Sequence, residues 1–171
     1  YNADNLWRPA SLTKLLTALV VLDEKVKMTS LVSMKAADEV GGSRLATKTG
    51  VQYTRTELLH ASLMGSANNA TNALARSTGL TKKQFAARMN AKAKALGASF
   101  VDFIEPTGIS EDNRTTAQDY IKVARAAFTN PTIAEILTKT QYTFTAKNNK
   151  KIKHTLGNTN KLLGDADISM L

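Results

Sequence analysis

Residues 8–19 of the chain read RPASLTKLLTAL, and the fold is organised around this stretch. Between Ser11 and Leu22, Lys14 is the only formally charged side chain, and most of the other positions hold leucine, valine or alanine. A helix that is apolar on almost all sides is typical of the interior of a domain. We therefore predict a central, largely buried helix over residues 11–24, with Ser11 and Lys14 three positions apart on one face.

The pairing of Ser11 with Lys14 suggests nucleophilic catalysis. Burial disfavours the charged form of an amine, so a buried lysine can accept a proton from a neighbouring hydroxyl. A serine activated in this way becomes a nucleophile. Two plainer interpretations stay open on these residues alone. The Ser-x-x-Lys spacing also arises by chance in a lysine-rich chain, and a serine at a helix start is often only a cap.

A second polar pair lies between two predicted helices. Thr54 and Glu57 form a capping-box pattern that starts one helix, Gly65-Ser66 interrupts it, and a helix resumes at Asn68. At such an interruption Ser66 and Asn68 can both point into one cleft. The hydroxyl can then relay a proton, and the amide can hold a carbonyl or amide of a substrate. The alternative is an ordinary polar helix cap.

The rest of the chain predicts a helix-rich domain with one late hairpin. Three more helix starts are predicted, at Thr81, Thr116 and Pro131. Alternating β-branched and aromatic residues predict a strand at 142–145, and residues 152–156 are its expected partner. Shorter extended segments are expected at 31–35 and 101–104.

Composition limits the classes of function. The 171 residues fit one domain with a real core, and 23 Lys+Arg against 14 Asp+Glu give a net charge of +9. A basic chain can contact nucleic acid, an anionic membrane or an acidic polymer. The lysines are dispersed, however, and the one dense cluster, at residues 150–153, has no interleaved aromatics. We expect a solvated basic surface and no nucleic-acid partner.

The chain offers little for a metal or a disulfide. It has no cysteine, which excludes disulfides, cysteine nucleophiles and thiolate metal sites. His60 and His154 have no nucleophile paired with them by spacing, so we expect packing or surface roles for both. Two histidines without cysteine do not indicate a structural zinc site, and we expect no cofactor.

Several motifs together resemble a known enzyme family. They are Arg-Pro-Ala-Ser-x-Thr-Lys-Leu at 8–15, Gly-Gly-Ser-Arg-Leu at 41–45, Glu-Leu-Leu-x-x-x-Leu-Met leading into Ser-x-Asn at 57–68, Phe-Val-Asp at 100–102, Pro-Thr-Gly-Ile-Ser at 106–110, Thr-Ala-x-Asp at 116–119 and Asn-Thr-Asn-Lys-Leu-Leu at 158–163. In this order, over nearly the whole chain, they resemble the penicillin-binding serine DD-peptidases. The closest resemblance is to the low-molecular-weight D-alanyl-D-alanine carboxypeptidases and endopeptidases.

The resemblance implies a fold and a mechanism. The fold is α+β and β-lactamase/transpeptidase-like, here mostly the helical region plus a β-hairpin. Ser11 would attack the carbonyl of the penultimate D-alanine, Lys14 would act as general base, Ser66 would relay protons, and Asn68 would orient the peptide. The partners implied are peptidoglycan peptides and β-lactams, which would acylate Ser11. The implied location is the periplasm or cell envelope.

A third family motif, Lys-Thr-Gly on a strand, would follow Ser-x-Asn. Lys48-Thr49-Gly50 precedes it, so we do not give it that role. Residues 167–171 resemble the lead-in to the true strand. We therefore expect residues 1–171 to be a single, incomplete catalytic domain that lacks core sheet strands at both ends, with one face of the helix at 11–24 uncovered. The chain alone would then be inactive, and a complementary fragment of the same protein is a further expected partner.

Three other functions stay under consideration. The first is a non-catalytic peptidoglycan-binding module of the same fold, suggested by the missing third motif. The second is a class A-like β-lactamase, which uses a later glutamate to activate water. Glu105 and Glu111 are the nearest in order, but neither sits in that family's motif, and the chain has Ser-Ala-Asn where that class has Ser-Asp-Asn. The third is a basic surface-binding domain with a chance Ser-x-x-Lys.

Overall fold

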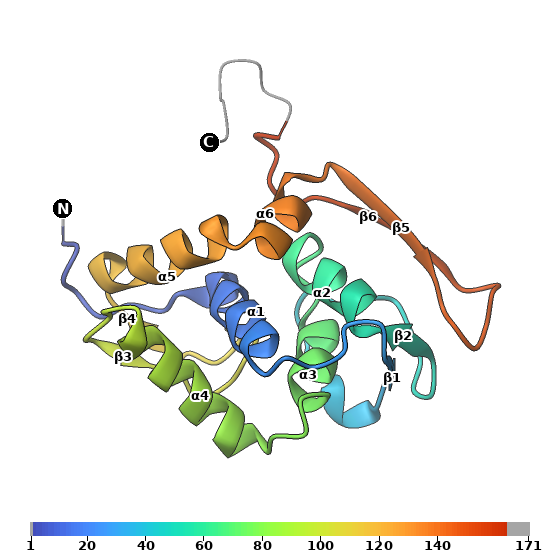
Figure 1. The fold of residues 1–171 in the computed structure, drawn as a ribbon, viewed down its shortest axis with the longest axis horizontal. Helices are drawn as coiled ribbons and strands as arrows, with labels where there is room; N and C mark the ends of the chain where they lie inside the picture. The colour runs from blue at the N-terminus through green and yellow to red at the C-terminus, as the bar shows by residue number, and fades with distance from the viewer. Residues whose placement is uncertain (1, 164–171) are drawn as a thin grey trace.

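A computed structural model describes residues 2–163 of the chain. Its α-helices are α1 (Thr13–Asp23), α2 (Arg55–Leu63), α3 (Asn68–Arg76), α4 (Lys82–Ala95), α5 (Ala117–Thr129) and α6 (Pro131–Thr138), with 3₁₀ turns η1 (Ala10–Leu12) and η2 (Ala36–Asp38). Its strands are β1 (Leu31–Ser33), β2 (Gln52–Thr54), β3 (Val101–Asp102), β4 (Arg114–Thr115), β5 (Gln141–Thr145) and β6 (Lys153–Gly157). The helix-rich content with a late hairpin agrees with the sequence prediction (Figure 1).

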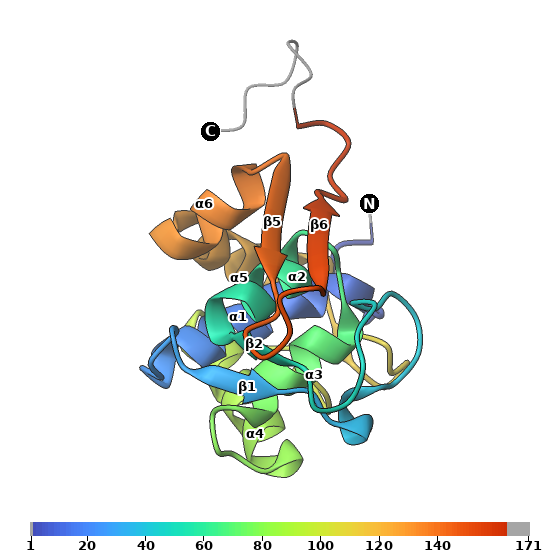
Figure 2. The ribbon, with the colours of Figure 1, turned by 90° about the vertical axis from the view of Figure 1, so that its right-hand side faces the viewer.

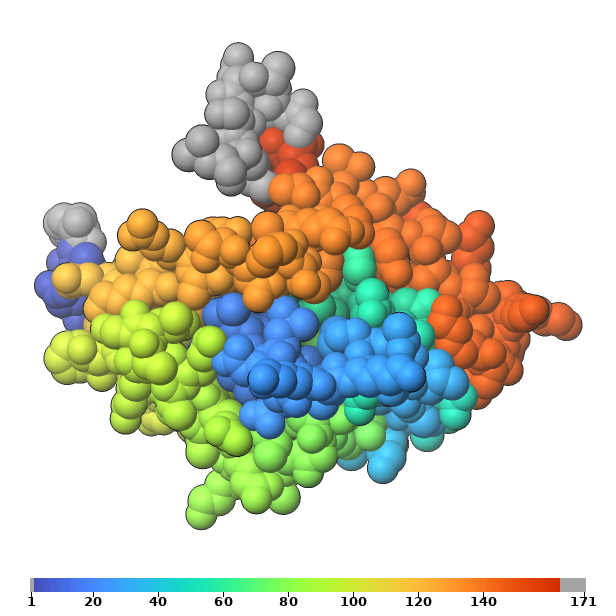
Figure 3. Space-filling view, viewed as in Figure 1, coloured from blue at the N-terminus to red at the C-terminus, as the bar shows by residue number. Residues whose placement is uncertain are grey.

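Helix α1 is the centre of the fold. Every residue from Thr13 to Val21 is buried, and α2, α3, α4 and α5 all pack against it. Figure 1 and the space-filling view in Figure 3 show α1 flanked by α5 on one side and α4 on the other. The expectation that one face of this helix is uncovered is wrong for residues 13–21, because the four helices and the turn at residues 105–108 together bury all nine of them.

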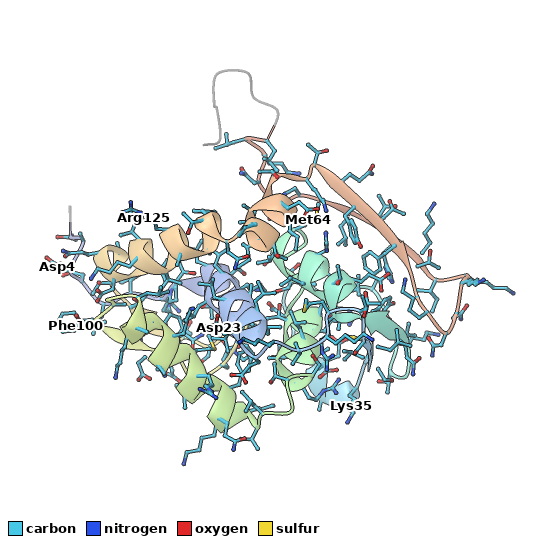
Figure 4. All side chains as sticks on the ribbon, in the orientation of Figure 1. Asp4, Asp23, Lys35, Met64, Phe100 and Arg125 are labelled. Carbon is cyan, nitrogen blue, oxygen red and sulfur yellow. The ribbon has the colours of Figure 1, made fainter. Side chains whose placement is uncertain are left out.

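The start of this central helix differs from the prediction. Ser11 lies in the 3₁₀ turn η1, and the α-helix begins at Thr13 and ends at Asp23. Pro9 supplies the carbonyl that accepts the Leu12 N–H at 3.2 Å, which is a tighter turn than an α-helix makes. At the other end, the Asp23 carboxylate pairs with Lys92 of α4 at 2.7 Å, and Figure 4 labels Asp23 at this end of α1.

The predicted helix starts are confirmed by their caps. Thr54 accepts the Glu57 N–H at 3.2 Å, and the Glu57 carboxylate accepts the Thr54 N–H at 2.8 Å. Thr81 and Gln84 form the same capping box, and Thr116 accepts the Asp119 N–H at 3.0 Å. Each cap satisfies N–H groups that have no partner inside the helix.

Three two-stranded antiparallel sheets surround the helices. In the β5–β6 hairpin, which confirms the two strands predicted at 142–145 and 152–156, Phe144 pairs with His154, and Figure 2 shows the hairpin beside α6 and α2. The His60 ring of α2 stacks on Tyr142 of β5 at a centroid distance of 3.7 Å, which fixes the hairpin to the helices. Strands β2 and β4 were not predicted, since segments of three and two residues carry no readable alternation.

No helix within residues 2–163 has both the length and the apolar character needed to cross a membrane.

Removing side-chain volume from α1 tests its role as the core. Leu16 is fully buried in the middle of the helix, so Leu16→Ala should lower the free energy of unfolding by about 2–5 kcal/mol, from lost burial plus the cavity left behind. Ile121 on α5 is 67% exposed, and Ile121→Ala should change stability by no more than about 0.5 kcal/mol. Urea unfolding followed by circular dichroism measures both, and equal losses would contradict a core centred on α1.

Candidate active site

Three of the four predicted site side chains meet at the start of α1. Lys14 Nζ donates a hydrogen bond to Ser11 Oγ at 3.1 Å, and Ser66 Oγ donates to the same oxygen at 2.9 Å. Ser11 comes from η1, Lys14 from the first turn of α1, and Ser66 from the break between α2 and α3. The Ser11 hydroxyl is therefore in direct contact with a potential base and a potential proton relay.

Lys14 is buried almost completely, with 2% of its surface exposed. Besides Ser11, its amine donates to the Thr107 carbonyl at 2.8 Å. Desolvation lowers the pKa of Lys14 to about 8, while the negative charge of Glu105 acts in the opposite direction. About a tenth of the amine is therefore neutral at pH 7 and about half at pH 8, and this neutral form is the one that can act as a general base.

Ser66 reaches Ser11 because the backbone is turned sharply between two helices. Ser66 has φ +53°, a left-handed conformation that costs a non-glycine residue about 1–2 kcal/mol. Hydrogen bonds on both sides hold this break, from Ala67 N–H to the Ala61 carbonyl at 3.0 Å and from Ser43 Oγ to the Gly65 carbonyl at 2.9 Å. Strain of this kind is often found where a side chain must be aimed at a site.

The turn that carries Ser11, η1, is held from two sides by segments distant in sequence. Ala10 also has a left-handed φ of +48°. Gly108, with φ +82°, lies so close to Ala10 that a Cβ at this position would be 1.8 Å from the Ala10 carbonyl oxygen. On the other side, the buried Tyr120 hydroxyl of α5 donates to the Leu12 carbonyl. Ser11 therefore sits in a turn with little freedom to move.

Asn68 lies differently from Ser66. Its side-chain Nδ2 donates to the Gly41 carbonyl at 2.9 Å, and its backbone N–H donates to the Ser43 carbonyl at 2.8 Å. The side chain is buried and does not line the cavity beside Ser11. In this structure Asn68 fastens the loop at residues 39–50 to the start of α3, and its role toward a substrate stays a prediction.

A cavity of about 400 Å³ opens beside Ser11. Its walls are mainly apolar, and the polar groups in it include Ser11, Lys14 and Ser66. One wall is the segment 158–160 after β6. These residues belong to the Asn-Thr-Asn-Lys-Leu-Leu motif, for which the sequence predicted no function. Asn158 is held there by hydrogen bonds to the carbonyls of Leu137 and Lys139, at 3.0 and 2.9 Å.

Lys48-Thr49-Gly50 lies elsewhere in the fold. The Gly50 N–H donates to the Met34 carbonyl at 2.9 Å, and the Gly50 carbonyl accepts from Asn148 Nδ2 at 2.9 Å. The segment belongs to the connection between β1 and β2, and none of its residues lines the cavity at Ser11. This placement agrees with leaving the segment out of the site. The expected strand lead-in at residues 167–171 lies outside the described residues.

The other side chains considered for acid–base chemistry bond or stack elsewhere and do not line the cavity. Glu105 accepts N–H groups of its own turn, and Glu111 pairs with Arg8. His60 stacks on Tyr142, and His154 bonds to the Tyr53 hydroxyl at 2.8 Å. Burial lowers the pKa of both histidines, which favours neutral, packed rings. The expectation of packing or surface roles for both histidines is confirmed, with His60 buried and His154 half-buried.

Comparison with known proteins gives consistent matches along the chain. Residues 1–170 match a family model described as D-alanyl-D-alanine carboxypeptidase. A D-alanyl-D-alanine endopeptidase of Pseudomonas aeruginosa is 34% identical over 168 residues, which cover 96% of this chain and 53% of the relative. The D-alanyl-D-alanine carboxypeptidase DacF of Bacillus subtilis is 31% identical, over 95% of this chain and 43% of the relative. The chain thus spans about half the length of these relatives.

Solved structures show the same arrangement. A D-alanyl-D-alanine carboxypeptidase from Mycobacterium tuberculosis H37Rv superposes with a TM-score of 0.86 at 32% identity, over 95% of this chain and 61% of that one. The Streptomyces K15 DD-transpeptidase gives a TM-score of 0.87 at 28% identity, over 96% of this chain and 69% of that one. The expected transpeptidase-like α+β fold is confirmed.

The close approach of Gly108 to the turn that carries Ser11 can be tested with a matched glycine. Gly79 has the same left-handed geometry, φ +86°, and a Cβ added there would have nothing within 4 Å of it. Gly79→Ala should cost about 1–2 kcal/mol for the backbone alone. Gly108→Ala adds the contact with Ala10 and should cost about 1–3 kcal/mol more. Urea unfolding of the two variants measures the difference, and equal costs would mean that this contact does not constrain the turn.

Proposed function

The chain belongs to the D-alanyl-D-alanine carboxypeptidase family, and we propose that it carries the acylation centre of a serine DD-peptidase that acts on D-Ala-containing peptidoglycan peptides. The observation that carries this proposal is the contact of one hydroxyl, Ser11 Oγ, with both Lys14 Nζ and Ser66 Oγ at the edge of a cavity. Both carboxypeptidases and endopeptidases are among its relatives, so the reaction class is hydrolysis next to a D-alanine.

The reaction proceeds through an acyl-enzyme in two steps. Neutral Lys14 takes the hydroxyl proton of Ser11 while Ser11 Oγ bonds to the carbonyl carbon of the penultimate D-alanine. The peptide C–N bond then breaks, and Ser66 relays the proton held by Lys14 to the leaving amine, so that Lys14 is neutral again. Water afterwards attacks the ester, giving one proton to Ser11 Oγ as the ester bond breaks, and the shortened peptide leaves as a carboxylic acid.

Two further groups act on the substrate in this proposal. The backbone N–H of Ser11 supplies one donor to the developing oxyanion, where a fixed dipole stabilises charge as it forms. Asn68 is the proposed orienting group for the peptide; because its side chain is buried outside the cavity and bonded to the Gly41 carbonyl, the peptide would have to extend past the cavity beside Ser11 to reach it. A β-lactam follows the same path, because opening of its strained amide forms the same ester on Ser11. The peptidoglycan substrate places the reaction in the periplasm or cell envelope.

We further propose that the 171-residue chain by itself is inactive as a peptidase and that its Ser11 is acylated only slowly. Within residues 2–163, no Lys-Thr-Gly sequence lines the cavity, since Lys48-Thr49-Gly50 lies at the β1–β2 connection. The groups that donate hydrogen bonds to the substrate on the side of the cavity facing away from α1 would therefore come from another segment, such as a complementary fragment of the same protein. A fast acylation rate for the chain alone would contradict this part of the proposal.

Labelling with a fluorescent penicillin tests the nucleophile. We expect an adduct of one equivalent on the wild-type protein, located on Ser11 by mass spectrometry of the digested protein, and none on Ser11→Ala. Ser99 is exposed on a loop before β3, so Ser99→Ala is the matched control and should label normally. An adduct of equal yield on Ser11→Ala, or no adduct on the wild type, would refute the acyl-enzyme.

The pH dependence of labelling tests the base. Lys14 has a pKa of about 8 and must be neutral to act, so the labelling rate should rise through about pH 8 and fall about tenfold per unit below it. Lys14→Ala should lose labelling while circular dichroism shows an intact fold, and the exposed Lys94→Ala should behave as wild type. A rate that is flat from pH 6 to 9 would count against Lys14.

A further inference from the structure

A single carboxylate shapes the turn that touches both Ser11 and Lys14. The turn is Glu105-Pro106-Thr107-Gly108, between β3 and β4. Glu105 Oε2 accepts the Thr107 N–H at 2.7 Å and the Thr107 hydroxyl at 2.6 Å. Glu105 Oε1 accepts the Gly108 N–H at 2.6 Å. Short bonds from several donors to one ionised group are among the strongest in proteins.

Asn113 braces the same turn from β4's side. Its Nδ2 donates to Glu105 Oε1 at 2.9 Å and to the Glu105 carbonyl at 3.0 Å. Its Oδ1 accepts the Ile104 N–H at 2.8 Å. Asn113 is fully buried, so these bonds are shielded from water. The carboxylate of Glu105 is therefore held in one orientation.

The turn presents three backbone groups to α1 and η1. The Thr107 carbonyl accepts from Lys14 Nζ at 2.8 Å, and the Pro106 carbonyl accepts from Thr17 Oγ1 at 2.7 Å. Gly108 packs directly on the Ala10 carbonyl, one residue before the nucleophile. The positions of both the base and the nucleophile turn thus depend on the shape of four residues that Glu105 ties together.

We propose that Glu105 is a positioning residue for the acylation centre: its carboxylate folds the turn that holds the Lys14 amine against Ser11, and its negative charge acts on that amine from behind the turn. This inference rests on the proposed function for its catalytic meaning. Glu105 does not line the cavity, so it acts through Lys14 and not on a substrate.

The charge of Glu105 opposes the effect of burial on Lys14. Desolvation lowers the pKa of Lys14, and Glu105 raises it, so the pKa of about 8 is the balance of the two. Tyr120, the other ionisable group near this turn of α1, has its pKa raised far above the usual range by burial and is neutral. Removing the charge of Glu105 should therefore move the pKa of Lys14 downward.

Other charges on the elements packed against α1 have partners of their own or face solvent. Two ion pairs join α4 to the far end of α1, Lys92 with Asp23 and Arg88 with Glu24. Each of α2, α3 and α5 contributes to a further pair: Glu57 of α2 with Lys147, Arg76 of α3 with Asp38, and Asp119 of α5 with Lys122. Lys82, Lys83, Lys94 and Arg125 are exposed. Arg55 bonds to Ser77, and His60 stacks on Tyr142. Among the described residues, Glu105 is the charged group that acts on the pKa of Lys14.

Titration of Lys14 by NMR in Glu105→Gln tests the inference without any substrate. Glutamine keeps the shape and one acceptor oxygen but removes the charge. We expect the pH at the midpoint of the Lys14 titration to lie about 0.5 to 1 pH unit below the wild-type value. Glu111, whose exposed carboxylate pairs with Arg8, is the matched control, and Glu111→Gln should leave the midpoint unchanged. An unchanged midpoint in Glu105→Gln would overturn the proposal.

A second variant separates charge from shape. Glu105→Asp keeps the charge but is one methylene too short to reach both Thr107 and Gly108. We expect its Lys14 midpoint to stay closer to wild type than that of Glu105→Gln, while its maximal rate of penicillin labelling falls at least fivefold. A purely structural role predicts lower thermal stability in both variants with the Lys14 midpoint unmoved, which would overturn the proposal. If wild type is not labelled, the proposed function fails, yet the NMR titration still decides the role of Glu105.

Discussion

The burial of one amine constrains the rest of this structure. A charged lysine in the first turn of a buried, apolar helix loses its hydration, so the fold must either supply hydrogen-bond acceptors or lower the pKa of the amine. The structure does both. The Thr107 carbonyl and the Ser11 hydroxyl accept from Lys14 Nζ, and desolvation brings its pKa to about 8. Helices α2, α3, α4 and α5 close around α1 and keep water away from it.

Local rules were enough to predict much of the fold. The apolar run after Ser11 predicted the buried helix, and the Thr-x-x-Glu and Thr-x-x-Gln patterns predicted two helix starts to the residue, because capping depends only on groups three positions apart. The i, i+3 spacing also predicted the contact of Lys14 with Ser11. Helix α1 still begins two residues later than expected, since a 3₁₀ turn and an α-helical turn differ little in sequence.

The rest of the site depends on contacts that no local pattern reports. Lys14 and Thr107 are 93 positions apart, and Ser11 and Ser66 are 55 apart. The left-handed backbone of Ser66 gives no signal in the sequence, because non-glycine residues adopt it only when their surroundings impose it. From the sequence, Glu105 was only one of two glutamates whose order matched the water-activating glutamate of a class A-like β-lactamase, without that family's motif around it. The Glu105 carboxylate in fact accepts hydrogen bonds from three donors of its own turn and from Asn113, and these contacts are visible only in three dimensions.

The anchoring of Asn158 has a mechanical consequence. Its side chain is tied to the carbonyls of Leu137 and Lys139, at the end of α6, and its N–H to the Thr140 carbonyl. The cavity wall that follows β6 is thus rigidly joined to a helix end and to a hairpin stacked on α2. Widening the cavity at this wall would therefore require breaking these bonds or moving α6 and the hairpin together with the wall.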